Sequence, residues 1–150
     1  MKITLIVLVL AMFLVSGCAI KDCQTDLNCF KELVKDCSKA KVNIIYDDNN
    51  LRLTSRGIWL EDCRLSFKIE QISEKLRQED PNLAMLAEGK TLNCAIPLQV
   101  VEQNQDEIID NILNLEEQFN EYCSGPIKDA LQGPLKNAVK EKMGMNIPLN

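Results

Sequence analysis

The first segment of the chain is its most hydrophobic. Lys2 precedes an almost uninterrupted apolar run from Ile3 to Val15, after which two small residues and a cysteine follow. A basic start, an apolar stretch and small residues, in that order, are typical of an export signal. A membrane-spanning helix needs about 20 predominantly apolar residues, and this run ends sooner. The pattern predicts a leader over residues 1–17; a transmembrane anchor and a buried core helix are the alternatives.

Downstream, the spacing of hydrophobic residues alternates between the helical and the strand period. Leu27, Phe30 and Val34 recur at three- and four-residue spacing, which predicts a helix. From Cys63 to Ile69 apolar and polar residues alternate, which predicts a half-buried strand. The predicted helices cover 26–38, a turn from Asp80-Pro81 to Gly89, 106–122, and 127–143 with an interruption at Gly133-Pro134. The predicted strands cover 41–46, 51–60 with a break at 55–57, 63–69, and 91–101 with Pro97 as an edge-strand signal.

The order of these elements predicts the fold class. A length of 150 residues suits a single domain. Strands grouped between helices are typical of an α+β protein. We therefore expect a small antiparallel sheet of about four strands, with N-terminal and C-terminal helices packed on it.

The end of the leader carries a specific motif. Residues Leu14-Val15-Ser16-Gly17-Cys18 resemble the lipobox of prokaryotic lipoproteins. The resemblance implies that lipid is attached to the Cys18 thiol and that signal peptidase II cuts before this residue. An ordinary secretory signal with a chance cysteine is the alternative. Because two or more acyl chains hold a protein stably on a bilayer, we expect a membrane anchor at Cys18, a tether over 18–25 and one domain over 26–150.

The remaining cysteines are even in number. In an exported chain such a set is typical of a disulfide framework, here of three bridges. Among the possible connectivities our first expectation is a Cys63–Cys94 bridge between strands of one sheet. A local Cys23–Cys29 bridge and a Cys37–Cys123 bridge between the terminal helices would complete the set, although spacing alone does not decide the connectivity. No two cysteines have the C-x-x-C spacing of a zinc ribbon or a redox pair. The six cysteines are Cys23, Cys29, Cys37, Cys63, Cys94 and Cys123.

Composition excludes several classes of function. The chain contains no histidine, which removes histidine-dependent catalytic triads and imidazole metal sites. Its formal charge is −5, with 17 basic residues, so a nucleic-acid partner is not expected. We expect neither a cofactor nor a metal. The segment 102–121 holds seven acidic residues and no basic one; we interpret it as a solvated helix face rather than as a docking surface for a basic partner.

Three segments carry residues that catalysis or ligand binding could use. Ser38 and Lys41 fit the S-x-x-K pattern of serine–lysine enzymes, but no accompanying motif occurs, so the match is interpreted as chance. Residues 47–50 offer oxygen ligands for calcium, yet the following residues do not fit an EF-hand loop. Trp59 lies between two apolar residues, and we expect it in the core rather than against a ligand. The sequence therefore indicates no catalytic residue.

A second resemblance concerns the mature domain. The cysteine-bearing helix, the short strands, the segment Gly89–Cys94 with Pro97 after it, and Cys123-Ser124-Gly125 resemble uncharacterised small lipoproteins of archaeal and some bacterial genomes. That likeness implies no activity. We expect a non-enzymatic binding or structural module of the cell envelope, on the outer face of the cytoplasmic membrane or on an outer membrane, with an envelope protein as a possible partner. A small surface-anchored envelope hydrolase is the alternative.

Overall fold

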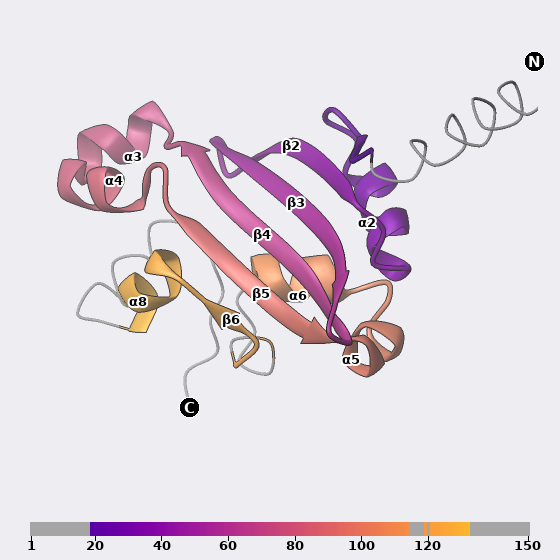
Figure 1. The fold of residues 1–150 in the computed structure, drawn as a ribbon. Coiled ribbons are helices and arrows are strands. Elements are labelled where there is room, and N and C mark those ends of the chain that lie inside the picture. Colours follow the sequence, from indigo (N-terminus) through magenta and orange to yellow (C-terminus); the bar gives the residue numbers. More distant parts are fainter. Residues whose placement is uncertain (1–18, 115–118, 120, 133–150) are drawn as a thin grey trace, which may run out of the picture.

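The fold is a single β-sheet with helices packed against it (Figure 1). The computed structural model describes residues 19–114, 119 and 121–132; the leader and Cys18 lie outside these residues. The strands are β1 (Lys21–Asp22), β2 (Ala40–Tyr46), β3 (Asn49–Trp59), β4 (Asp62–Gln71), β5 (Thr91–Pro97) and β6 (Cys123–Ser124). The helices are α2 (Leu27–Lys35), α3 (Glu74–Glu79), α4 (Pro81–Ala87), α5 (Leu98–Gln103), α6 (Ile108–Leu113) and α8 (Pro126–Gln132).

The sheet is larger than the sequence predicts. It has six strands in the order β1-β2-β3-β4-β5-β6. Strand β1 is parallel to β2, whereas the other neighbours are antiparallel. The α+β class is therefore confirmed, and the prediction of about four antiparallel strands is wrong. The two missed strands have two residues each, which is too short for an alternating pattern; one of them lies in the segment expected to be a tether.

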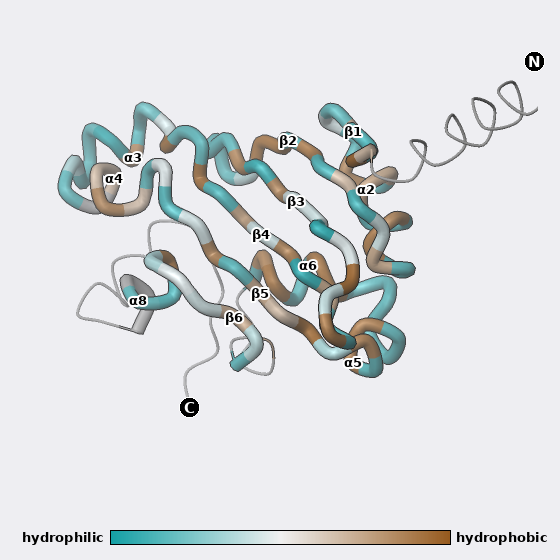
Figure 2. The backbone as a smooth tube through the Cα atoms, viewed as in Figure 1, coloured by the Kyte–Doolittle hydropathy of each residue, from teal (hydrophilic) through white to brown (hydrophobic). Residues whose placement is uncertain are grey.

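The core lies on the face of the sheet that the helices cover. On β4 the side chains of Cys63, Leu65, Phe67 and Ile69 are buried, as their alternation predicts. Figure 2 shows this alternation along the central strands. Helix α2 adds Phe30 and Val34, both completely buried, and α6 adds Ile108, Ile109 and Ile112. The opposite face of the sheet carries mainly polar side chains.

Helix α2 begins where the sequence predicts. Asp26 is its N-cap, and the Asp26 carboxylate accepts a hydrogen bond from the Cys29 amide at 3.0 Å. Two lysines of α2 then pair with the acidic segment: Lys31 with Asp110 at 2.6 Å and Lys35 with Asp106 at 2.8 Å. These acidic residues therefore bind the helix to its neighbours within the fold.

Three disulfides hold the elements together. Cys23–Cys29 is confirmed, but the other two expected pairs are wrong, because Cys37 pairs with Cys63 and Cys94 with Cys123. The register explains the error, since Cys63 lies opposite Ile96 on β5 rather than opposite Cys94. Cys94 instead faces Cys123 across the β5–β6 pair, with a Cα–Cα distance of 4.0 Å. Three disulfides indicate an oxidising, extracytoplasmic environment.

Other boundaries also differ from the prediction. The expected break at 55–57 is a β-bulge within one continuous strand, because the β3–β4 register shifts between Ser55 and Ile58. Strand β5 ends at Pro97, where α5 begins. The turn after Asp80-Pro81 is confirmed as α4. The predicted helices over 106–122 and 127–143 correspond to α6 and α8, and residues 115–118, 120 and 133–143 lie outside the described residues.

None of the helices within the described ranges combines the length and the apolar run that a bilayer span requires.

Candidate functional site

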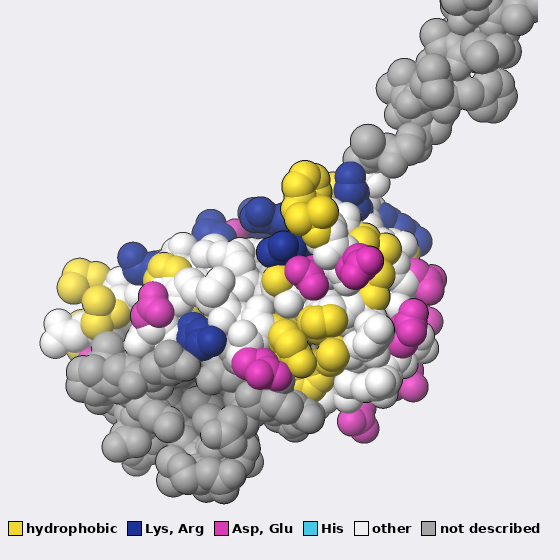
Figure 3. Space-filling view, turned by 60° about the horizontal axis from the view of Figure 1, so that its bottom comes forward, with side chains coloured by type: hydrophobic (Ala, Val, Ile, Leu, Met, Phe, Trp, Pro, Cys, Tyr) yellow, Lys and Arg dark blue, Asp and Glu magenta, His cyan; other side chains and the backbone are white. Residues whose placement is uncertain are grey.

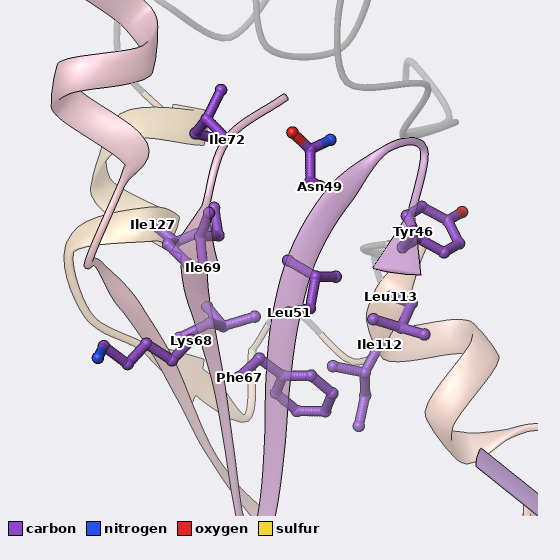
Figure 4. A pocket seen from close by; sticks show the side chains of 11 residues that line it. Tyr46, Asn49, Leu51, Phe67, Lys68, Ile69, Ile72, Ile112, Leu113 and Ile127 are labelled. Carbon is purple, nitrogen blue, oxygen red and sulfur yellow. The ribbon is translucent and has the colours of Figure 1, made fainter. Parts of the chain in front are cut away.

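The covered face of the sheet contains a small apolar cavity (Figure 4). It has a volume of about 70 Å³ and lies between strands β2–β4 and helices α6 and α8. Leu51, Phe67 and Ile112 are among the side chains that line it. The side-chain amide of Asn49 already forms hydrogen bonds within the protein. Its Oδ1 accepts a hydrogen bond from the Ser73 amide at 2.9 Å, and its Nδ2 donates one to the Asp47 carbonyl at 3.0 Å.

This cavity does not have the features of a ligand site. Ligand pockets usually enclose about 300–1,000 Å³, and even an engineered cavity that binds benzene has about 150 Å³. The cavity is smaller than both, and its walls offer no polar group free to orient a ligand. We interpret it as a packing void.

The open face of the sheet carries a larger groove. Its volume is about 580 Å³, and it runs across the ends of β3, β4 and β5 toward β6. Polar and apolar groups share its surface. Its chemistry is set by Lys39, Arg56, Trp59, Arg64, Asn93 and Tyr122.

Two cations of the groove have no acidic partner in the described part of the chain. Within residues 19–114, 119 and 121–132, no ion pair includes Lys39 or Arg56. The Lys39 stem lies against Gly57 in the β-bulge, because Gly57 has φ +87° and a Cβ there would lie 3.1 Å from Lys39 Cγ. The absence of a side chain at Gly57 thus leaves room for the Lys39 stem, and Lys39 and Arg56 both line the groove.

Arg64 supplies the third cation of the groove. Its Nη2 lies 3.4 Å from Asp62 Oδ2, which is a loose ion pair at a partly exposed site. Its Nε is buried and makes no hydrogen bond in the described part of the chain. A buried donor without an acceptor is costly. The rest of the Arg64 side chain is partly exposed to the groove, so an anionic group can approach its guanidinium there.

A row of polar side chains continues the groove across the sheet. Ser66 on β4, Asn93 on β5 and Ser124 on β6 lie opposite one another. The Ser66 hydroxyl donates to Asn93 Oδ1 at 3.0 Å. A hydrogen bond to the Glu121 carboxylate raises the pKa of Tyr122 above its ordinary value, so this hydroxyl stays neutral at physiological pH.

Beside the groove, the β3–β4 turn exposes three consecutive apolar residues. Ile58, Trp59 and Leu60 are 56%, 65% and 81% exposed. We call these three residues the apolar tip. Figure 3 shows a face of the molecule on which exposed hydrophobic side chains lie next to lysine and arginine side chains.

The apolar tip corrects one expectation. The core position predicted for Trp59 is wrong, because this side chain points to solvent at the rim of the groove. The sequence held a signal for it: successive strand residues point to opposite faces, so three consecutive apolar residues next to a turn cannot all be buried.

The structure does not assemble the serine–lysine pair. Ser38 follows the end of α2, whereas Lys41 lies in β2, so the two are not one helical turn apart. The Lys41 ammonium is also committed, since it lies 2.9 Å from Asp22 Oδ2. Residues 47–50 form a hairpin turn and the start of β3. Among the described side chains, no three cysteines or carboxylates gather as metal ligands.

Comparison with protein-family models, with curated proteins and with solved structures finds no match to this chain. Its function is therefore inferred from the groove, the apolar tip and the compartment.

Proposed function

We propose that the protein is a lipid-anchored, non-enzymatic binding module outside the cytoplasm, and that its groove binds an anionic group. The disulfides support the compartment, and the lipobox-like end of the leader supports an anchor at Cys18. The binding site is the groove on the open face of the sheet.

This proposal rests mainly on the cationic side chains of the groove, which have hydrogen-bond donors without an acceptor among the described residues. Lys39 and Arg56 make no ion pair with the described acids, and the Arg64 Nε has no acceptor there. A guanidinium favours carboxylate or phosphate groups, with which it forms charge-assisted hydrogen bonds. The groove is thus suited to an anion although the whole chain carries a formal charge of −5.

The anchor is tested by intact mass spectrometry of the native protein extracted from membranes. We expect a chain that starts at Cys18, carries lipid, and is six hydrogens lighter than its reduced form, as three disulfides require. The Cys18→Ser variant should keep its leader and carry no lipid. A native chain with a free Cys18 thiol and an intact leader would contradict the anchor.

The groove is tested by NMR titration of the mature protein with inorganic pyrophosphate. The Arg64 Nε–H resonance should shift, because an anion bound at the exposed part of the guanidinium changes the electrostatic environment of the whole group. Arg56→Gln and Lys39→Gln should weaken the shift, whereas Lys75→Gln, which removes an exposed lysine from α3, should not. An unchanged resonance, or equal effects of all three variants, would rule out the groove as the anion site.

A further inference from the structure

The strand directions place the N-terminal segment and the apolar tip at the same end of the sheet. Strand β1 runs parallel to β2, which is antiparallel to β3. The register aligns Lys21 with Ala40 and Ala40 with Ser55. The start of β1 therefore lies toward the end of β3, where the chain turns into β4. Figure 1 shows this turn beside α5 and far from α3 and α4.

Cys18 lies three positions before Lys21 in the sequence. Three residues span at most about 10 Å when fully extended. A lipid attached at Cys18 would thus hold this end of the sheet, and not the end with α4, close to the bilayer.

The apolar tip has the composition of a segment that enters a membrane interface. Trp59 is an amphipathic aromatic residue, a type enriched where membrane and water meet. Its neighbours Ile58 and Leu60 are aliphatic and exposed. The Glu61 carbonyl accepts a hydrogen bond from the Leu98 amide at 3.1 Å, so α5 holds the turn in place. The tip is a fixed projection of the sheet rather than a loose loop.

The cations of the groove lie directly behind the tip. Lys39, Arg56 and Arg64 line the groove together with Ile58 and Trp59. Along the chain, the acidic residues nearest to the apolar tip are Glu61 and Asp62. Of these two, Asp62 already forms an ion pair with Arg64. A bilayer offers lipid to the apolar tip and anionic headgroups to the cations a few ångströms further out.

We infer that the apolar tip inserts into the membrane that holds the lipid anchor, and that the anionic group bound by the groove is a phospholipid headgroup of that membrane. This inference rests on the proposed lipid anchor and deepens the proposed function of the groove. The module lies with the β3–β4 end of its sheet on the bilayer and with α4 away from it.

Trp59 is the natural reporter for this inference, because it is the single tryptophan of the chain. The lipidated mature protein is reconstituted into vesicles of phosphatidylcholine and phosphatidylglycerol whose acyl chains carry bromine. We expect loss of most of the Trp59 emission relative to unbrominated vesicles, together with protection from aqueous iodide. Emission that bromine leaves unchanged would overturn the inference. This holds also for blue-shifted emission, which would mean that a second copy of the chain, rather than lipid, covers the tip.

Two matched variants separate the tip from other exposed apolar residues. Leu60→Asp places a charge in the tip and should restore the emission. Met85→Asp places the same charge on α4, where Met85 is 72% exposed, and should leave the quenching unchanged. Equal effects of both variants would contradict the assigned orientation.

The headgroup part is tested by omitting phosphatidylglycerol. Quenching should weaken in neutral vesicles, and Arg56→Gln with Lys39→Gln should remove the difference between the two vesicle types. Equal quenching in both vesicle types would overturn the headgroup assignment. Flotation of the vesicles distinguishes the two proposals: protein that does not float contradicts the lipid anchor, whereas floating protein with an unquenched Trp59 contradicts only the inserted tip.

Discussion

The two ends of the sheet close with the same turn geometry but with different residues. Asp47-Asp48 joins β2 to β3, and Leu60-Glu61 joins β3 to β4, each as a two-residue loop. Both residues of both loops have positive φ, at 47° and 63° in the first and 50° and 70° in the second. Aspartate tolerates this conformation, whereas leucine and glutamate do not favour it. Only the first turn therefore agrees with its local preference.

The two ends also differ in whether the charged side chains on the open face form ion pairs. Near the Asp47-Asp48 turn, Glu70 lies 3.0 Å from Arg52 Nη1 and 2.9 Å from Lys68 Nζ. Near the Leu60-Glu61 turn, Lys39 and Arg56 have no such partner among the described residues.

This contrast agrees with the proposed contact of the Leu60 end with a membrane. Natural proteins break some local rules at functional sites. At the Leu60 end the chain combines an unfavourable turn, exposed apolar side chains and cations that have no acidic partner among the described residues. Substitutions at the two ends test this difference.

Among changes at the Leu60 end, the largest effect is expected from the disulfide beside it. Cys63 follows this turn closely and is bonded to Cys37 after α2. Its loop spans 26 residues, whereas Cys23–Cys29 spans 6. Chain entropy predicts a loss of about 3–4 kcal/mol for Cys37→Ala with Cys63→Ala, and of about 2 kcal/mol for Cys23→Ala with Cys29→Ala. Urea unfolding measures both, and a larger loss for the shorter loop would contradict the ranking.

The second test compares a glycine at each end. Gly57 has φ +87° and would place a Cβ 3.1 Å from Lys39 Cγ, whereas Gly89 has φ +74° and open space around its Cβ position. Gly57→Ala should cost about 2 kcal/mol, because it adds crowding to conformational strain, and Gly89→Ala about 1 kcal/mol. Thermal unfolding gives the two values. Equal losses would mean that Lys39 is not held across the bulge.

The third test places a residue that accepts positive φ in the Leu60-Glu61 turn, and a leucine in the Asp47-Asp48 turn. Leu60→Asn should stabilise the protein by about 0.5–1 kcal/mol, because asparagine accepts positive φ and the replaced side chain is 81% exposed. Asp48→Leu in the other turn should destabilise it by a similar amount. Denaturant midpoints of the two variants decide the matter, and a destabilised Leu60→Asn would show that Leu60 packs in the folded state.

The smallest effect is the pH dependence of the stability that Glu70 contributes through its ion pairs near the Asp47-Asp48 turn. A hydrogen bond from Lys68, helped by the charge of Arg52, lowers the pKa of Glu70 below its usual value. A lowered pKa in the folded state means stability that is present above the unfolded pKa of about 4.3 and is lost as the pH falls through the folded value. Glu70→Gln should remove a few tenths of a kcal/mol at neutral pH, as for other surface ion pairs, and nothing at low pH. A loss that persists at low pH would point to packing instead.

Local patterns predicted the elements that depend on local chemistry. The Asp26 cap with Phe30 and Val34 determined α2, and the alternation from Cys63 to Ile69 determined β4. Strands β1 and β6 escaped prediction because their two residues each are ordered by neighbours far along the chain. The connectivity of Cys37 and Cys94 depends on the same long-range pairing.

The groove was not predicted because its residues are scattered along the sequence. Lys39, Arg56, Arg64 and Asn93 come from four segments that only the sheet register brings together. Whether a cation has an acidic partner is likewise a property of the folded chain. The apolar tip was the one part with a local signal, since Ile58, Trp59 and Leu60 interrupt the alternation.

Hydrogen exchange at the two turns tests the central claim most directly. The lipidated protein is measured by mass spectrometry in anionic vesicles and after release into detergent. If the Leu60 end contacts the bilayer, the peptide with Leu60 and Glu61 is protected only in vesicles, while the peptide with Asp47 and Asp48 exchanges equally in both. Equal exchange of the Leu60 peptide in the two conditions would contradict the account.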